Sequence, residues 1–390
     1  MRFIKQNSFI FVTLMVIALS IITFHFILET PVYEGKSTPF LIPIFNFTVD
    51  APFDLSDTWF TTHYIVNYFD YEFLKRGLVG SFYKLFNGTY SNEALCLLQL
   101  SFILLSVVIT HYFFSKHQLN KKYIYLLFII SPATFMQFSY DFARFDCLLV
   151  SIFLLSVVFR HNLALFILFS TIGILTHELY IFTLLPASFL LFLSEKIDLT
   201  SLKEIFATSI ASKVFYTLVL FILVVFAFGN YEPGFEQFKE VSLRSNPSIT
   251  EFFNLWNRSI LKDLSAIVST MPYSVVILFI FVYSAIMIYF HLIGVKFKKP
   301  QYYLIILMSS PVFFIAWDWW RFLALIYISI FVVFVITERN KASVVSNKYM
   351  LLFSLYGPLT IAHLPKTPLI QLLAIPGVRI VKQYLFNLIH

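Results

Sequence analysis

Long apolar segments recur along the whole of this 390-residue chain, and they restrict its fold more than any other feature. Each spans roughly 17 to 25 residues, enough to cross a hydrocarbon core of about 30 Å as a helix. Charged residues make up only 13% of the sequence, whereas a soluble protein carries about 25%. The segments lack the alternating pattern of membrane barrels, and backbone in lipid must be hydrogen-bonded within its own segment. We therefore expect an all-α, polytopic integral membrane helix bundle.

The breaks between apolar segments predict eleven or twelve transmembrane helices in a single membrane domain, residues 1–390. A last segment, near 368–381, contains Pro376 and Gly377 and is either a short span or an interfacial helix. Several middle spans are shorter than twenty residues, which favours re-entrant geometry, bilayer thinning or burial among neighbours. The other spans are predicted near residues 8–28, 94–114, 123–139, 146–159, 162–176, 179–194, 211–229, 271–293, 301–316, 322–337 and 348–363.

The distribution of charge predicts which side of the membrane each loop faces. Arg2 and Lys5 precede a first apolar segment that is too long for a signal peptide, so we expect an uncleaved first helix with a cytoplasmic N-terminus. If each span then reverses the side, fifteen basic but only four acidic residues face the cytoplasm. This is the positive-inside pattern, and it explains the net charge of +7 better than nucleic-acid binding does. We expect a multi-pass protein of the bacterial inner membrane, with the bilayer as its partner.

Two extracytoplasmic loops, 29–92 and 230–270, are too long to be simple connections. Both contain aromatic residues, such as Trp59 and Trp256, so short amphipathic helices at the membrane interface are expected there. The two cysteines, Cys96 and Cys147, have no spacing suited to zinc or to a disulfide framework.

The first loop holds an acidic cluster in which Asp50, Asp54 and Asp57 lie within eight residues. Such carboxylates can supply a general base or bind a divalent cation. A solvated acidic loop is the alternative, with about equal weight. The same loop continues with further ionisable residues, namely His63, Asp70, Glu72, Lys75 and Arg76.

A second cluster, YDFARFD, places Asp141, Arg144 and Asp146 at a short outer turn between two predicted spans. Asp141 and Arg144 are three residues apart and can pair on one helical face. An ion pair that caps the turn is therefore the structural alternative to a binding role.

Two more clusters lie at the outer ends of spans. His177 and Glu178 border the hydrocarbon, where ionisable residues are costly unless they face a cavity. A histidine that only packs between helices is the alternative. Asp318 and Arg321 lie among three tryptophans, which can simply form the interfacial aromatic belt.

All four clusters are predicted on the same side of the membrane. A bundle that brings them together would form one cavity near the outer leaflet. Its carboxylates would accept a proton, while Arg76, Arg144 and Arg321 would bind phosphate through their planar guanidinium groups. This predicts group transfer from a lipid-linked phosphate donor. The chain has no P-loop, no Rossmann fingerprint and no GxSxG motif.

With this layout, the chain resembles the GT-C-type glycosyltransferases and the O-antigen or capsule polymerases of bacteria. The resemblance covers the first helix, the acidic outer loop and the many-helix body, without an exact signature. It implies that Asp54 or Asp57 is the base or a metal ligand, with Glu178 and His177 as the second candidates. It also implies that the three arginines bind the polyprenyl pyrophosphate, and Asp146 and Asp318 complete the predicted substrate site.

The partners would then be a lipid-linked sugar donor and a glycan acceptor, and a divalent cation is the one cofactor that the acidic loop suggests. The large soluble C-terminal domain of many GT-C enzymes has no counterpart here, which favours a compact polymerase or small transferase. A transporter or flippase of lipid-linked oligosaccharide is the main alternative, although it should place charges near the bilayer midplane. A membrane acyltransferase is less favoured, because His177 is predicted on the side away from a cytoplasmic acyl donor.

Overall fold

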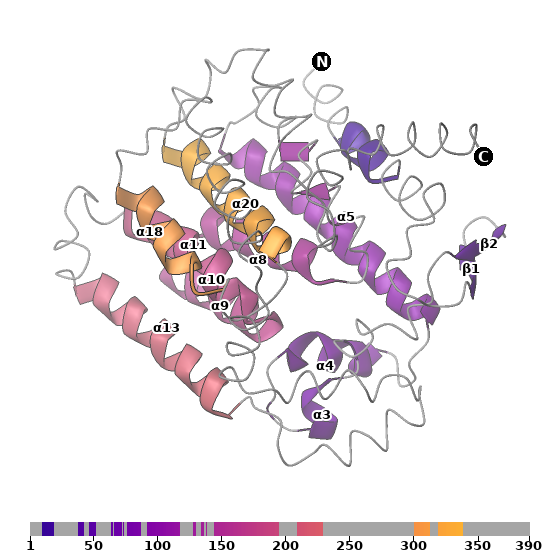
Figure 1. Cartoon of the computed structure of the whole chain (residues 1–390), viewed down its shortest axis with the longest axis horizontal. Coiled ribbons are helices and arrows are strands. Elements are labelled where there is room, and N and C mark those ends of the chain that lie inside the picture. Colours follow the sequence, from indigo (N-terminus) through magenta and orange to yellow (C-terminus); the bar gives the residue numbers. More distant parts are fainter. Residues whose placement is uncertain are drawn as a thin grey trace, which may run out of the picture.

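The computed structural model describes about half of the chain (Figure 1), and all structural statements below concern that part. The described residues are 10–18, 38–42, 47–51, 64, 66–71, 73, 76–86, 92–117, 128–129, 134–135, 138, 144–194, 209–228, 300–312 and 319–337.

The described part is helical apart from one two-stranded hairpin, which confirms the helical class. Residues 10–18 form a helical segment. The strands are β1 (Thr38–Ile42) and β2 (Phe47–Ala51), which pair antiparallel. The helices are α3 (Tyr68–Tyr71), α4 (Gly77–Phe86), α5 (Asn92–Lys116), α8 (Asp146–Val158), α9 (Leu163–Thr176), α10 (Leu179–Thr183), α11 (Leu185–Ser194), α13 (Ser209–Phe228), α18 (Pro300–Ser309) and α20 (Trp319–Thr337).

Helices α5 and α8 pack together and run in the same direction. Near their first residues, Nε2 of Gln99 donates to the carbonyl of Arg144 at 3.0 Å. Near their last residues, Nζ of Lys116 donates to the carbonyl of Val158 at 3.1 Å.

Helix α20 also begins at the end of the bundle where α8 begins, because its Arg321 contacts Asp146. Its last residue, Thr337, lies 3.5 Å from the hydroxyl of Tyr302 near the start of α18, so α18 and α20 are antiparallel. We call the end that contains Asp146 the Asp146 end, and the opposite one, with Lys116, the Lys116 end. Helices α3 and α4 lie at the Asp146 end, and α13 packs on α9 at the edge of the view (Figure 1).

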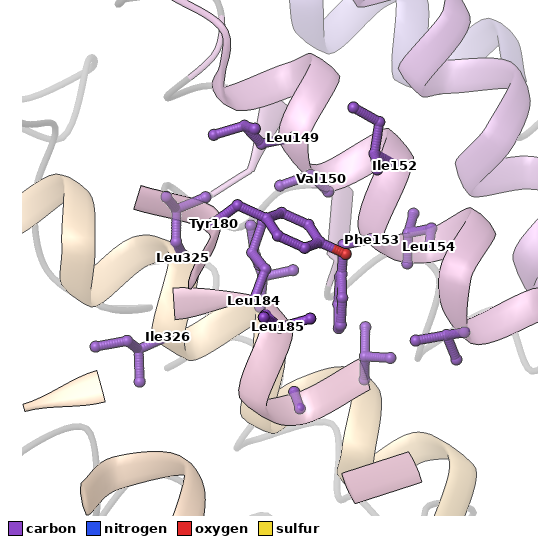
Figure 2. Packing of buried hydrophobic residues seen from close by; sticks show 14 of the residues in the cluster. Leu149, Val150, Ile152, Phe153, Leu154, Tyr180, Leu184, Leu185, Leu325 and Ile326 are labelled. Carbon is purple, nitrogen blue, oxygen red and sulfur yellow. The ribbon is translucent and has the colours of Figure 1, made fainter. Parts of the chain in front are cut away.

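The core lies between α8, α10, α11 and α20, whose side chains are apolar on nearly every face. A helix that is hydrophobic all round is surrounded by other apolar groups, in a protein core or in a membrane. Figure 2 shows Tyr180 of α10 lying among Leu149 and Phe153 of α8 and Leu325 of α20. Its ring also lies over Gly173 of α9, where an added Cβ would come within 2.7 Å of the ring. The glycine therefore lets α9 and α10 approach closely.

Helices lie where spans were predicted in the described residues, but one predicted span is divided. The span predicted at 179–194 comprises α10 and α11, with Pro186 in the first turn of α11, where its missing N–H interrupts the regular helix. The span predicted at 301–316 contains α18, which ends at Ser309, and residues 313–316 lie outside the described residues. The spans predicted at 271–293, 348–363 and 368–381, and the loop 230–270, lie outside the described residues, as does most of 8–28 and of 123–139.

Of the described helices, one is long and apolar enough to cross a membrane, by length and composition alone. It is Leu97–Lys116 within α5, with 20 residues and a mean hydropathy of 1.9. The other apolar stretches that the structure describes have 10–17 residues: Asp146–Val158, Leu163–Thr176, Leu185–Ser194, Ser212–Val225 and Arg321–Thr337. Tight turns after Val158 and after Thr176 end the first two of them.

The first long loop differs in part from its prediction. Helices α3 and α4 are short, as expected for interfacial helices. The hairpin of β1 and β2 was not predicted and is a local exception within an otherwise helical structure. Residues such as Phe40, Val49 and Thr48 favour strands because aromatic and β-branched side chains fit a pleated surface.

Candidate functional site

A buried ion pair joins α20 to α8 at the Asp146 end. The guanidinium of Arg321 binds the carboxylate of Asp146 at two points, with Nε to Oδ2 at 2.6 Å and Nη2 to Oδ1 at 2.5 Å. Both side chains are almost fully buried, with 4% and 3% exposed. Asp146 is also in the first turn of α8, where the helix dipole favours a negative charge. The pair fixes the first turns of two core helices against each other.

A second ion pair forms between residues 102 positions apart, Arg76 and Glu178. Arg76 donates from Nε to Oε2 at 2.6 Å and from Nη2 to Oε1 in a second, short hydrogen bond. The side chains are 14% and 19% exposed, so this pair is closer to the surface than the first. Burial is the largest single influence on Glu178 and opposes its ionisation, but the charges and hydrogen bonds of Arg76 and His177 together outweigh it and hold the pKa of this carboxyl well below its usual range.

His177 lies beside both pairs, in the extended turn between α9 and α10. Its Nδ1 accepts the backbone N–H of Leu179 at 3.1 Å, so in this arrangement the neutral ring carries its proton on Nε2. Burial lowers the pKa of His177 to about 4, and the charges of Arg76 and Arg321 act in the same direction. The contact between Nδ1 and Oε2 of Glu178, at 3.3 Å, is therefore not an ion pair at neutral pH. His177 is a neutral group between two charged pairs.

Arg76 has an unusual backbone conformation, with a φ of 66°. This left-handed region is costly for a residue with a side chain and is found at positions fixed by their surroundings. Helix α4 begins at the next residue, and its Gly80 packs directly on the backbone carbonyl of Val66. Ser81 of α4 also accepts the N–H of Tyr68 at 2.7 Å. The packing of α4 against the segment around Val66 and Tyr68 thus determines the direction of the Arg76 side chain.

A buried polar chain supports the turn before α8. The hydroxyl of Tyr64 donates to Oε1 of Gln99 at 2.9 Å, and Gln99 donates to the carbonyl of Arg144. The ring of Tyr64 lies edge-on to Phe145, with centroids 5.0 Å apart. The side chain of Arg144 is buried, 4% exposed, two residues from Asp146. Sequence reasoning missed Tyr64 and Gln99; a polar Gln inside an otherwise apolar predicted span was the available signal.

The structure brings together a large part of the predicted site. The side chains of Arg76, Asp146, His177, Glu178 and Arg321 gather at the Asp146 end, with Arg144 in the adjoining turn. They come from the loop before α4 and from α8, the α9–α10 turn and α20. The carboxylates of Asp146 and Glu178 act here as counter-ions of arginines rather than as separate acids.

Several predicted residues are not part of this gathering. Asp70 pairs with Lys84 of α4 and accepts from Nδ2 of Asn67 at 2.9 Å, so its partners are not those of the two arginine pairs. Of Asp50 only the backbone is described, in β2. The predicted base candidates Asp54 and Asp57 and the predicted substrate residue Asp318 lie outside the described residues, as do Asp141, His63, Glu72 and Lys75.

The described residues contain no group of three or more His, Cys, Asp or Glu side chains arranged to bind a metal ion. Cys147 is buried and is not in a disulfide.

Comparisons with known proteins assign this chain to no family. No family model, no curated protein and no solved structure matches it. The arrangement of residues at the Asp146 end is therefore what an inference about function must rest on.

Proposed function

We propose that the chain is a membrane-embedded glycosyltransferase or polysaccharide polymerase that uses a polyprenyl-phosphate-linked sugar donor at the extracytoplasmic face. The observation that carries this proposal is the gathering of Arg76, Glu178, His177, Asp146 and Arg321 at one end of an apolar helix bundle. Arginine binds phosphate at two points and stays charged in a partly buried site. Carboxylates beside it are the groups needed to remove a proton from an acceptor hydroxyl.

Membrane residence is supported by the outward faces of the helices. Large apolar side chains are exposed along α5, α13 and α18, among them Leu104, Val108, Tyr216, Leu220 and Leu307. Soluble monomers rarely expose contiguous apolar surface on this scale, whereas lipid is a suitable solvent for it. We therefore retain the eleven or twelve crossings expected from the sequence, with the shorter helices buried among neighbours.

The charges at the two ends support the proposed orientation. At the Lys116 end, Lys116 donates to the last carbonyls of α8, and so does Arg160 through Nη1 to the carbonyl of Val157 at 2.8 Å. The carboxylates of Asp146 and Glu178 lie at the opposite end. Positive loops face the cytoplasm in membrane proteins, so the Asp146 end would face outward, toward a lipid-linked donor and its acceptor.

The proposed reaction is an inverting transfer. A carboxylate takes the proton of the acceptor hydroxyl, whose oxygen bonds to the anomeric carbon of the donor sugar. The bond from that carbon to the phosphate oxygen breaks, and its electron pair leaves with the polyprenyl phosphate. Arginine charge stabilises this leaving group, and stabilisation of developing charge is commonly the largest contribution to such catalysis.

The experiment that tests the proposal is sugar transfer by the full chain in membrane vesicles. A polyprenyl-phosphate-linked donor with a labelled sugar is supplied together with a glycan acceptor. We expect Arg76→Gln and Glu178→Gln to reduce the rate by a factor of about 100 or more, while Asp70→Asn, in an ion pair elsewhere, leaves it within about twofold. If the wild-type chain transfers no sugar while the same vesicles move the intact donor between leaflets, the transferase proposal is wrong.

That second outcome would identify the alternative, a flippase of lipid-linked oligosaccharide. One observation favours it: both arginine pairs join separate helical segments, as gating contacts in a transporter do. Loss of a gating pair would alter movement of the donor without any dependence on a glycan acceptor.

A further inference from the structure

We propose that Arg76 is the arginine that binds the donor phosphate. The phosphate displaces Glu178 from Arg76, and Glu178 then becomes the base. This inference rests on the proposed function and assigns roles within the same site. In this proposal Arg76 exchanges Glu178 for the phosphate, whereas Arg321 stays bound to Asp146.

The two arginine pairs differ in their access to solvent. Arg76 and Glu178 are 14% and 19% exposed, whereas Arg321 and Asp146 are 4% and 3% exposed. A phosphate can therefore reach the first pair from solvent. Reaching the second would require α8 and α20 to separate at the first turns of both helices, where the core is closely packed.

The two-point contact of Arg76 with Glu178 has a geometry that a phosphate can also adopt. Arg76 presents Nε and Nη2, one edge of its guanidinium, to the two oxygens of Glu178. Two oxygens of a phosphate fit the same edge in the same two-point arrangement. Carboxylate and phosphate thus compete for one surface of Arg76, and binding of the donor requires Glu178 to leave it.

The backbone conformation of Arg76 holds its side chain at the site. Its left-handed φ of 66° is set by the start of α4, which the contact of Gly80 with Val66 fixes in place. Residues held in such conformations occur at ligand clamps, where the surroundings rather than the residue's own preference determine the geometry. The guanidinium is therefore held at the site independently of its bond to Glu178.

The displacement changes the chemistry of Glu178. While bound to Arg76 it is a weak base, because the guanidinium stabilises its ionised form. Once the phosphate neutralises Arg76, burial beside neutral His177 favours proton uptake. Glu178 can then accept the acceptor's hydroxyl proton, while the polyprenyl phosphate departs with its electron pair toward Arg76. Glu178 therefore becomes an effective base only when the donor is bound. In the empty site Arg76 keeps it a weak base.

The test is the affinity of the full chain, purified in detergent, for farnesyl diphosphate as a soluble probe. We expect Arg76→Gln to weaken binding about tenfold or more, since a charge-assisted contact is lost. Glu178→Gln should instead tighten binding by about tenfold, because the competitor for Arg76 has been removed. A pair that only stabilises the fold predicts weaker binding in both variants, and that result would overturn the exchange.

A control variant and a substitute variant complete the binding experiment. Asp70→Asn removes the carboxylate of the Asp70–Lys84 pair on the same helical hairpin and should leave affinity unchanged. If Glu178→Gln does not fold, Glu178→Asp keeps the charge, draws it away from Arg76 and should also tighten binding. If the wild-type chain binds no farnesyl diphosphate, the proposed function is lost together with this inference. If it binds and Glu178→Gln weakens binding, only the exchange is wrong.

Discussion

At the residue scale, the two arginine pairs have the same chemistry but different burial, and burial determines what each one contributes. A buried ion pair adds little net stability, yet removing one partner leaves an uncompensated charge in the core. The pair of Arg321 and Asp146 is in this situation, whereas the pair of Arg76 and Glu178 has partial access to solvent. The first pair should therefore matter most for folding, and the second for ligand binding.

We predict that Arg321→Gln destabilises the protein by about 3 to 5 kcal/mol, because Asp146 is left charged and buried. Asp146→Asn should do the same through Arg321. The double variant should recover a large part of the loss, since neither charge remains. Thermal unfolding of the purified chain measures this, and strictly additive losses in the double variant would contradict the pairing.

His177 gives a prediction about pH. Its pKa is lowered to about 4 in the folded protein from a usual value of 6.5, so the unfolded chain binds a proton in this interval and the folded one does not. Stability should therefore fall as pH decreases from 6.5 toward 4, by about 2 kcal/mol at pH 5 for this group. Glu178, whose pKa is lowered below its usual 4.5, adds a further loss at more acidic pH.

The variant that isolates the histidine is His177→Asn, whose side-chain oxygen can still accept the N–H of Leu179. Melting temperatures of both proteins at pH 7 and pH 5 give the comparison. We expect the difference between the two pH values to shrink by several degrees in the variant. An unchanged difference would mean that His177 is not held neutral.

At the element scale, the position of Arg76 depends on the seating of α4 against the segment around Val66. Gly80 and Gly77 allow this contact in different ways. A Cβ at Gly80 would lie 1.9 Å from the backbone carbonyl of Val66, which cannot move away without shifting the chain. A Cβ at Gly77 would meet the far end of the Tyr68 ring, which can rotate.

We predict that Gly80→Ala destabilises the protein by about 3 kcal/mol or more, because overpacking against backbone is not easily relieved. It should also weaken binding of farnesyl diphosphate, since Arg76 precedes this helix. Gly77→Ala is the matched control and should cost about 1 kcal/mol. Equal losses of stability and affinity in the two variants would show that α4 is not seated by Gly80.

The helices could be predicted from the sequence far better than their interruptions. Apolar segments bounded by charges located α8, α9, α13 and α20 to within a few residues, because burial of apolar surface determines them directly. The break before α11 was missed, although Pro186 was a visible signal, because the apolar composition continues through it. The β1–β2 hairpin was missed because an aromatic, turn-rich loop was interpreted as interfacial helix.

The site was predictable only as a set of candidates. Ionisable residues at the ends of apolar segments identified Asp146, His177, Glu178 and Arg321, since such residues are costly near lipid without a partner. Arg76 was identified as one of the ionisable residues of the first outer loop. Their pairing was not predictable: Arg76 binds a residue 102 positions away, and Asp146 one that is 175 positions away. Long-range pairing depends on the packing of helices, which a single sequence does not determine.

At the scale of the whole molecule, the account requires the two ends of the bundle to lie on opposite sides of a membrane. Parallel α5 and α8 place Gln99 and Asp146 at one end and Lys116 and Val158 at the other. The proposed donor and acceptor then reach Arg76 only from outside the cell. Positions on the two ends can be compared directly, through Lys84 in α4 and the exposed His161 between α8 and α9.

The most direct measurement is labelling of single introduced cysteines with a membrane-impermeant maleimide, with the parent chain as the blank. We expect Lys84→Cys to react in intact cells and His161→Cys to react only in inverted membrane vesicles. Labelling of both cysteines from the same side, or recovery of the chain in the soluble fraction, would contradict an outward-facing site in a membrane-spanning bundle.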